Sequence, residues 1–98
     1  MNIEKIKNDN EVILVLSGRL DTTTAPQLDA MIQEVTPNIS SLVLDFTDLD
    51  YLSSSGLRVL LAAQKIMNKQ GTMVIRHVNE TIAEVFEITG FVDILTIQ

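Results

Sequence analysis

Short runs of branched aliphatic residues recur along the chain and predict β-strands. Residues 11–16 (EVILVL) are almost continuously apolar, which is typical of a strand buried on both faces of a sheet. The turn-forming residues 8–10 (NDN) join this run to residues 3–6 and therefore predict an opening hairpin. The further predicted strands are 41–46 (SLVLDF), 72–76 (TMVIR) and a weaker edge strand at 91–97.

Between these strands, apolar residues recur three and four positions apart and predict three helices. Pro26 falls in the first turn of the first helix, where a missing N–H costs nothing. Gly71 is expected to follow the second helix as its C′ residue. The predicted boundary residues are Thr24 and Pro37 for the first helix, Ser53 and Gly71 for the second, and Asn79 and Gly90 for the third.

This order of elements, β-β-α-β-α-β-α, predicts an α/β fold. After the opening hairpin, strands that alternate with helices favour parallel pairing, with the helices packed on the sheet. We therefore expect a mixed sheet of four to five strands with three or more helices. The sequence contains no repeat, linker or low-complexity segment, so residues 1–98 are expected to form one domain.

Composition narrows the possible functions. The chain has 7 Lys and Arg against 13 Asp and Glu, a net charge of −6, and only 4% aromatic residues. Neither nucleic acid nor an anionic membrane surface is an expected partner, because both attract basic proteins. The absence of Cys and the single His leave no thiolate nucleophile and no Cys-based zinc site. We expect no metal, no cofactor and no enzymatic activity.

The N-terminal residues indicate where the protein is located. Residues 1–10 are polar and of mixed charge, without the apolar core of a secretory signal. The longest uninterrupted apolar run, 12–16, is far shorter than the roughly 18 residues that a membrane span needs. We expect a cytoplasmic protein.

The serines at the start of the second helix are the strongest candidates for chemistry. Ser53, Ser54 and Ser55 follow a predicted strand and an acidic loop, and sites in open α/β sheets lie beyond the carboxyl ends of strands. One serine can be explained as an N-cap. Gly56 lowers helix propensity, which suggests that another group approaches the backbone closely. Phosphorylation is the functional alternative, because free N–H groups and the helix dipole can accommodate a phosphate.

Other candidate sites are weaker. The serine loop has no G-x-x-x-x-G-K-[ST] pattern, so it does not resemble a P-loop. His77 has no placed catalytic partner and is interpreted as a structural or surface histidine. Asp45, Asp48 and Asp50 could suggest a magnesium site, but such acids are more often turn residues.

A second polar segment, residues 18–25 (GRLDTTTA), also leads from a strand end to a helix start. Taken alone, it is best explained as a turn followed by a threonine N-cap. It would lie near the serines if the two preceding strands are neighbours.

Together these two segments resemble the signatures of the STAS domain of bacterial anti-sigma factor antagonists. Residues 15–21 (VLSGRLD), followed by 22–25, resemble the first signature. Residues 42–45 (LVLD), followed by 52–57 (LSSSGL), resemble the second, in which D-S-[ST]-G-[LI] opens a helix. The resemblance extends through residues 71–74 to the ending at 86–91 and so covers nearly the whole chain.

The resemblance implies a partner switch. The unmodified domain would bind an anti-sigma factor serine kinase and so release the sigma factor, phosphorylation would end that binding, and a serine phosphatase would reset the cycle. Ser54 matches the phosphorylated serine of the family, and Ser53 and Ser55 are less favoured as the site. Ser53 stands where the family usually has an acidic residue before the phosphorylated serine. The implied partner-binding residues are Asp21, Thr22, Ser53, Ser54, Ser55, Gly56, Leu57 and Arg58.

Two alternatives remain open at this stage. The replacement at Ser53 also suits a STAS subunit that is never phosphorylated, for example one that docks onto the ATPase of a lipid-transport ABC complex. A small nucleotide-binding protein is the alternative from another class, although the lysine and the base that it would need are missing.

Overall fold

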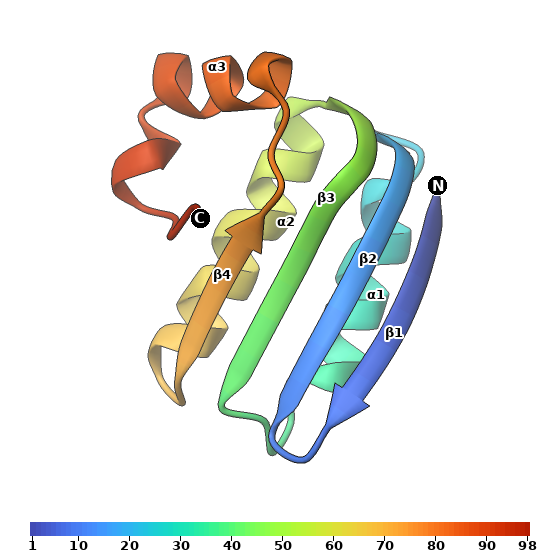
Figure 1. Ribbon diagram of the computed structural model, residues 1–98, viewed down its shortest axis with the longest axis vertical. Helices are drawn as coiled ribbons and strands as arrows, with labels where there is room; N and C mark the ends of the chain where they lie inside the picture. The colour runs from blue at the N-terminus through green and yellow to red at the C-terminus, as the bar shows by residue number, and fades with distance from the viewer.

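The strands lie side by side in the same order as in the sequence (Figure 1). The computed structural model describes all residues from 1 to 98. The first two strands pair antiparallel as a hairpin, whereas the second, third and fourth pair parallel, as predicted. The strands are β1 (Asn2–Asn8), β2 (Glu11–Leu20), β3 (Ser41–Leu52) and β4 (Thr72–Arg76).

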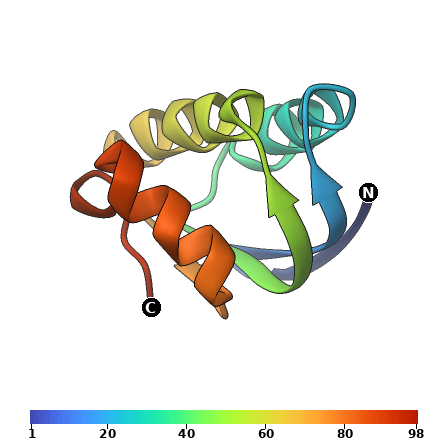
Figure 2. The same cartoon turned by 90° about the horizontal axis from the view of Figure 1, so that it is seen from above.

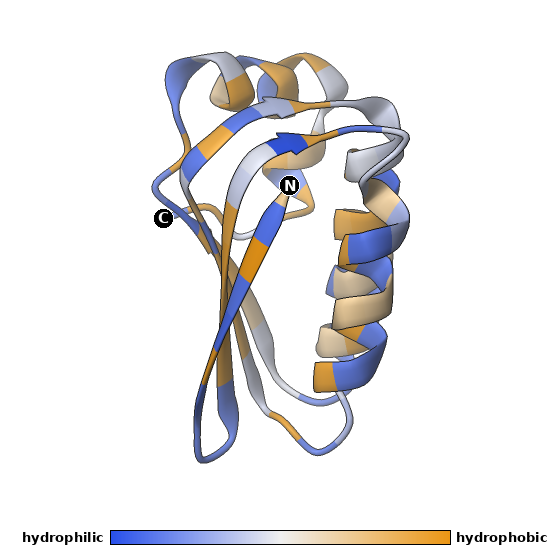
Figure 3. Cartoon of the chain, turned by 90° about the vertical axis from the view of Figure 1, so that its right-hand side faces the viewer, coloured by the Kyte–Doolittle hydropathy of each residue, from blue (hydrophilic) through white to orange (hydrophobic).

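The three predicted helices are present, and α1 and α2 cover one face of the sheet (Figures 1 and 3). The third, α3, lies beyond the carboxyl ends of the strands and is followed by a short 3-10 turn (Figure 1). None of the helices is long and apolar enough to cross a membrane. Their bounds are Ala25–Val35 for α1, Ser54–Asn68 for α2, Glu80–Thr89 for α3 and Phe91–Asp93 for the 3-10 turn η1.

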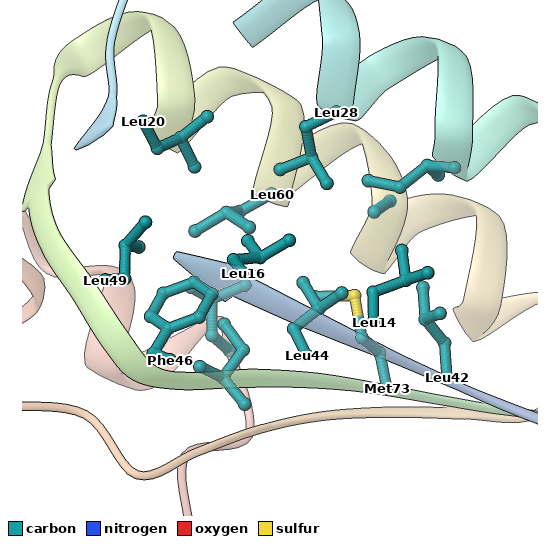
Figure 4. Packing of buried hydrophobic residues seen from close by; sticks show 14 of the residues in the cluster. Leu14, Leu16, Leu20, Leu28, Leu42, Leu44, Phe46, Leu49, Leu60 and Met73 are labelled. Carbon is teal, nitrogen blue, oxygen red and sulfur yellow. The ribbon is translucent and has the colours of Figure 1, made fainter. Parts of the chain in front are cut away.

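The hydrophobic core lies between the sheet and the two covering helices (Figure 4). Alternate residues of β2 point into it, which is why Leu14 and Leu16 are fully buried while Val15 between them is only half-buried. Leu28 from α1 and Leu60 from α2 meet them from the helix side (Figure 4). Each such leucine contributes roughly 1.5–3 kcal/mol by leaving water, so this layer fixes the helices on the sheet.

Two strands extend beyond their predicted ends. The parallel ladder between β2 and β3 continues to the pair Leu20 and Leu52, with register shifts in β2 on the way. The prediction of an acidic loop after residue 46 was therefore wrong. Leu49 is buried while its neighbours Asp48 and Asp50 are exposed, so this stretch has the alternation of a strand with one solvent face.

The predicted edge strand at 91–97 was also wrong. Gly90 has a φ of +80° and turns the chain into η1, which places Leu95 in the core. Only Ile97 then forms a bridge with β4, at Ile75. The turn at Gly90 and η1 therefore replace most of the predicted strand, and Leu95 is the buried side chain that this path provides.

Gly71 is not the C′ residue of α2 that we predicted, because Lys69 is the C-cap residue and Gln70 follows it. Gly71 also lacks a positive φ, unlike Gly18 and Gly90. A Cβ atom at Gly71 would lie 1.9 Å from the carbonyl oxygen of Ser40. Close backbone packing therefore explains this glycine.

Candidate functional site

The two segments with the sequence signatures lie next to each other at the carboxyl ends of β2 and β3. In Figure 2 both strands turn upward side by side into the helices that follow them. The main-chain N–H of Ser53 donates to the carbonyl of Leu20 over 2.9 Å. The hydroxyls of Thr22 and Ser55 are hydrogen-bonded, with 3.2 Å between their oxygens. Parallel pairing of neighbouring strands thus brings together turns that lie more than 30 residues apart in the sequence.

The first turn is organised by Asp21. Its Oδ1 accepts hydrogen bonds from the Thr23 hydroxyl at 2.8 Å and from the N–H groups of Thr23 and Thr24 at 3.0 and 3.2 Å. The Thr23 hydroxyl, with these N–H groups and the Thr24 hydroxyl, lowers the pKa of Asp21 against the opposing effect of burial. The carboxylate is therefore charged at neutral pH and its position is fixed.

Thr24 occupies the N-cap position of α1, but its side chain does not cap the helix. Its hydroxyl instead accepts a hydrogen bond from the N–H of Asp21 and donates one to the carbonyl of Arg19, both at 2.8 Å. The predicted threonine cap was wrong in this respect, because the Thr24 hydroxyl is already hydrogen-bonded within the tight turn before the helix.

The three serines at the start of α2 have different environments. Ser53 is the N-cap residue, and its Oγ accepts a hydrogen bond from the N–H of Gly56 at 3.4 Å. Ser55 is half-buried and hydrogen-bonded to Thr22. Ser54 is exposed, and its hydroxyl makes no hydrogen bond within the chain. Of the three, Ser54 therefore has the hydroxyl that is most accessible to another protein.

Two of the predicted partner-binding residues lie in the interior. A Cβ atom on the buried Gly56 would lie 2.7 Å from side-chain carbons of Leu20 and Leu52, so close packing within the chain explains this glycine. Leu57 is also buried and belongs to the hydrophobic core. The exposed part of the predicted surface is formed by Thr22, Ser54 and Arg58, with Asp21, Ser53 and Ser55 half-buried among them.

The sequence of the whole chain decides the family. The sequence model of the STAS domain family matches residues 2–98. The chain belongs to the STAS domain family. One relative of this STAS domain is BtrV of Bordetella bronchiseptica, described as a candidate anti-sigma factor antagonist, which is 37% identical over 99% of this chain and 85% of its own length. The anti-sigma-B factor antagonist of Bacillus subtilis is 28% identical over 100% of this chain and 91% of its own.

Solved structures have the same fold. An anti-sigma factor antagonist from Mycobacterium paratuberculosis superposes with a TM-score of 0.89 at 23% identity, over 98% of this chain and 83% of that protein. The antagonist SpoIIAA in its unphosphorylated form superposes with a TM-score of 0.85 at 19% identity, over 99% and 88% of the two chains. SpoIIAA has also been solved in a phosphorylated form, with a TM-score of 0.78 at 19% identity and coverage of 99% and 91%. These structures confirm the predicted α/β fold.

In this STAS domain, the site is flanked by an Arg–Tyr pair. This pair was not identified from the sequence. The guanidinium carbon of Arg19 lies 4.1 Å from the ring centre of Tyr51, a cation–π contact, and Arg19 Nε lies 3.7 Å from Asp21 Oδ2. The pair forms because β2 and β3 place the two residues opposite each other. Only the register of the two strands could have revealed it.

The remaining acidic candidates do not form a metal site. No three His, Asp or Glu side chains of the chain are arranged so that they could hold a metal ion. Asp45 instead lies buried in the sheet and is paired with Arg76, whose Nε is 3.2 Å from Asp45 Oδ2. His77 Nδ1 lies 3.2 Å from Asp45 Oδ1, which agrees with the structural role predicted for this histidine.

The charge of Asp45 is stabilised by its hydrogen bonds. Burial by itself raises the pKa of this carboxyl group, but bonds from the hydroxyl and N–H of Thr47, from His77 and from Arg76 outweigh burial. The pKa of Asp45 consequently lies far below its usual range. This network joins the middle of β3 to the end of β4 and is structural.

Proposed function

We propose that this STAS domain is an anti-sigma factor antagonist that is controlled by phosphorylation of Ser54. The unmodified domain binds an anti-sigma factor serine kinase and thereby releases the sigma factor. The observation that carries the proposal is the free, exposed hydroxyl of Ser54, between two serines whose hydroxyls are hydrogen-bonded within the chain. The names of the relatives support the class of partner.

In the proposed cycle, the chain is the substrate of the kinase. In the kinase, the Ser54 Oγ would attack the γ-phosphorus of ATP, with release of ADP and of the hydroxyl proton. ATP and magnesium would belong to the partner. A serine phosphatase would hydrolyse the phosphate and restore the binding state. Nothing in the fold has to change for this cycle, because Ser54 is exposed on the first turn of a helix.

The direction of the switch follows from charge. A phosphate adds about −1.5 to −2 charges at neutral pH, on a surface that already contains the ionised Asp21. In a packed interface this charge would lose its hydration and repel acidic groups of the complex. A loss of about 2.8 kcal/mol would already weaken binding a hundredfold.

Intact-mass spectrometry after incubation with the cognate kinase and Mg-ATP tests the proposal. We expect one phosphate on the wild-type chain and on the Ser53→Ala and Ser55→Ala variants, and none on Ser54→Ala. The two neighbouring variants are matched controls, because each removes one hydroxyl from the same turn. Phosphate that persists on Ser54→Ala would contradict the assignment, and localisation of the modified peptide would then identify the serine that is used.

A constitutive STAS subunit is the second candidate, and Ser53 is the observation that favours it. This side chain is neutral where the family usually has an acidic residue, and it caps α2. Ser54→Asp distinguishes the two functions in a pull-down from the organism's own cells. A partner-switching domain loses its kinase on this substitution. A constitutive subunit retains its partner and is not phosphorylated.

A further inference from the structure

Arg58 is the one arginine of the chain without an ionic partner. Arg19 Nε lies 3.7 Å from Asp21 Oδ2. Arg76 Nε lies 3.2 Å from Asp45 Oδ2. Arg58 is exposed and forms no ion pair and no cation–π contact within the chain. A guanidinium is always charged at neutral pH and has five N–H donors, so this side chain is free to bind an anion.

Arg58 stands four residues after Ser54 on the same helix, α2. Residues four apart are neighbours on one face of a helix, with about 5–6 Å between their Cβ atoms. Helical side chains lean toward the N-terminus of the helix, so a long side chain at position 58 covers the surface of the turn before it. That turn begins with Ser54, and both residues are exposed. An anionic group on Ser54 is therefore within reach of the guanidinium.

We propose that Arg58 binds the phosphate once Ser54 is phosphorylated, an inference that rests on the proposed function. The phosphate oxygens accept hydrogen bonds from the guanidinium, whose planar fork of donors matches the geometry of phosphate. The anion precedes the cation by four residues, which is the favourable order of charges along a helix. Arg58 is thus a positioning residue that holds the phosphate against the first turns of α2.

The other cations near the two turns are engaged or distant. Arg19 is held between the carboxylate of Asp21 and the ring of Tyr51. Lys65, the next basic residue of α2 after Arg58, lies about three turns, or about 16 Å, beyond Ser54 along the helix. The position of Arg58 therefore assigns the phosphate to this side chain.

The pairing adds to the effect of the new charge on binding. In the unmodified chain, Arg58 is a free cation on the exposed surface that it forms with Thr22 and Ser54. Phosphorylation adds about −1.5 to −2 charges beside it and occupies its donors. A partner that binds the unmodified surface through an acidic group therefore loses a cation at the same step at which it meets a new anion.

The full chain with Ser54 incorporated as phosphoserine during translation tests the pairing without any kinase. A pH titration followed by ³¹P NMR measures the second pKa of the phosphate, which is ordinarily about 6. We expect this pKa to be about 0.3 pH units lower with Arg58 than in Arg58→Gln, because the guanidinium favours the doubly charged phosphate. The difference should shrink in 1 M salt, which screens exposed charges.

Lys65→Gln is the matched control, since it removes the same charge from the same helix at a distance from Ser54. It should leave the pKa of the phosphate unchanged. The proposal is overturned if Arg58→Gln titrates at the same pH as the chain with Arg58, or if Lys65→Gln changes the pKa as much as Arg58→Gln does. Failure of the cognate kinase to phosphorylate Ser54 would instead refute the proposed function, so the two failures are distinguishable.

Discussion

The hydroxyl oxygens of Thr22 and Ser55 lie 3.2 Å apart and join the two turns that carry the STAS signatures. The bond leaves Ser54, the residue between Ser53 and Ser55, as the one hydroxyl of the three without a partner. The parallel pairing of β2 and β3 is the cause of the Thr22–Ser55 contact. Under the proposed function, Ser54 is the serine whose hydroxyl is free to enter a kinase active site.

A double-mutant cycle with Thr22→Val and Ser55→Ala should detect this bond. Because the pair is exposed, we expect a coupling energy below about 1 kcal/mol in the free energy of unfolding. Urea denaturation of the wild type, both single variants and the double variant measures it. Strictly additive effects would show that the two hydroxyls do not interact in solution.

Ser53→Ala should lower stability without preventing phosphorylation, whereas Ser54→Ala should prevent phosphorylation with little change in stability. Ser53→Ala removes the N-cap of α2 and should lower the free energy of unfolding by roughly 0.5–1 kcal/mol, at the low end for a cap because the bond is 3.4 Å long. Ser54→Ala should change it by less than about 0.5 kcal/mol, as is usual for surface positions. Urea midpoints and intact masses of the same samples compare the two. A larger loss of stability in Ser54→Ala would mean that its hydroxyl has a structural role.

Substitution by alanine should destabilise the fold to different extents at Gly56 and Gly71. At Gly56 the new methyl group would meet side-chain carbons of Leu20 and Leu52 at 2.7 Å, and we expect a net loss of about 1–2 kcal/mol after the gain in helix propensity. At Gly71 it would meet the backbone oxygen of Ser40 at 1.9 Å, and backbone gives way less readily than a side chain.

Gly71→Ala should therefore be the more destabilising of the two substitutions, by thermal or urea unfolding. Gly90→Ala provides a comparison in which no atom lies within 4 Å of the new methyl group and only the left-handed conformation opposes it. If Gly56→Ala were neutral or stabilising, the close packing of α2 on the strand ends would not persist in solution.

Stability should depend on pH through Asp45. Its pKa is lower in the folded chain than the ordinary value of 3.8, so its stabilising effect is complete above that value and is lost as the pH falls through the folded pKa. Asp45→Asn should lower the free energy of unfolding by about 2 kcal/mol at pH 7, because bonds to a charged acceptor are lost. The difference from wild type should shrink toward pH 2.

Urea unfolding measured from pH 7 to pH 2 follows this difference. Asp48→Asn is the matched control, since it removes one charge from an exposed position of the same strand. A constant difference between Asp45→Asn and wild type over the whole range would mean that the carboxylate of Asp45 does not stabilise the fold.

The sequence alone determined the order and type of most elements, because local patterns encode them. The strand β2, the opening hairpin and the three helices depend on neighbouring residues, and each was predicted and is present. The prediction that β2 is buried on both faces was wrong, because only alternate residues of the strand are buried. The two polar segments were also recognisable from sequence, since the residues that build each turn lie close together in the chain. Their resemblance to the STAS signatures is what implied phosphorylation of Ser54, whereas the residues alone could also be explained by an N-cap.

Only the tertiary structure decided how these segments are used. The strand beyond residue 46, the close packing at Gly56 and Gly71 and the Thr22–Ser55 bond all depend on contacts between residues distant in the sequence. Such contacts are set by strand register and by the fit of helices on the sheet. The spacing of residues along the chain therefore does not predict these contacts.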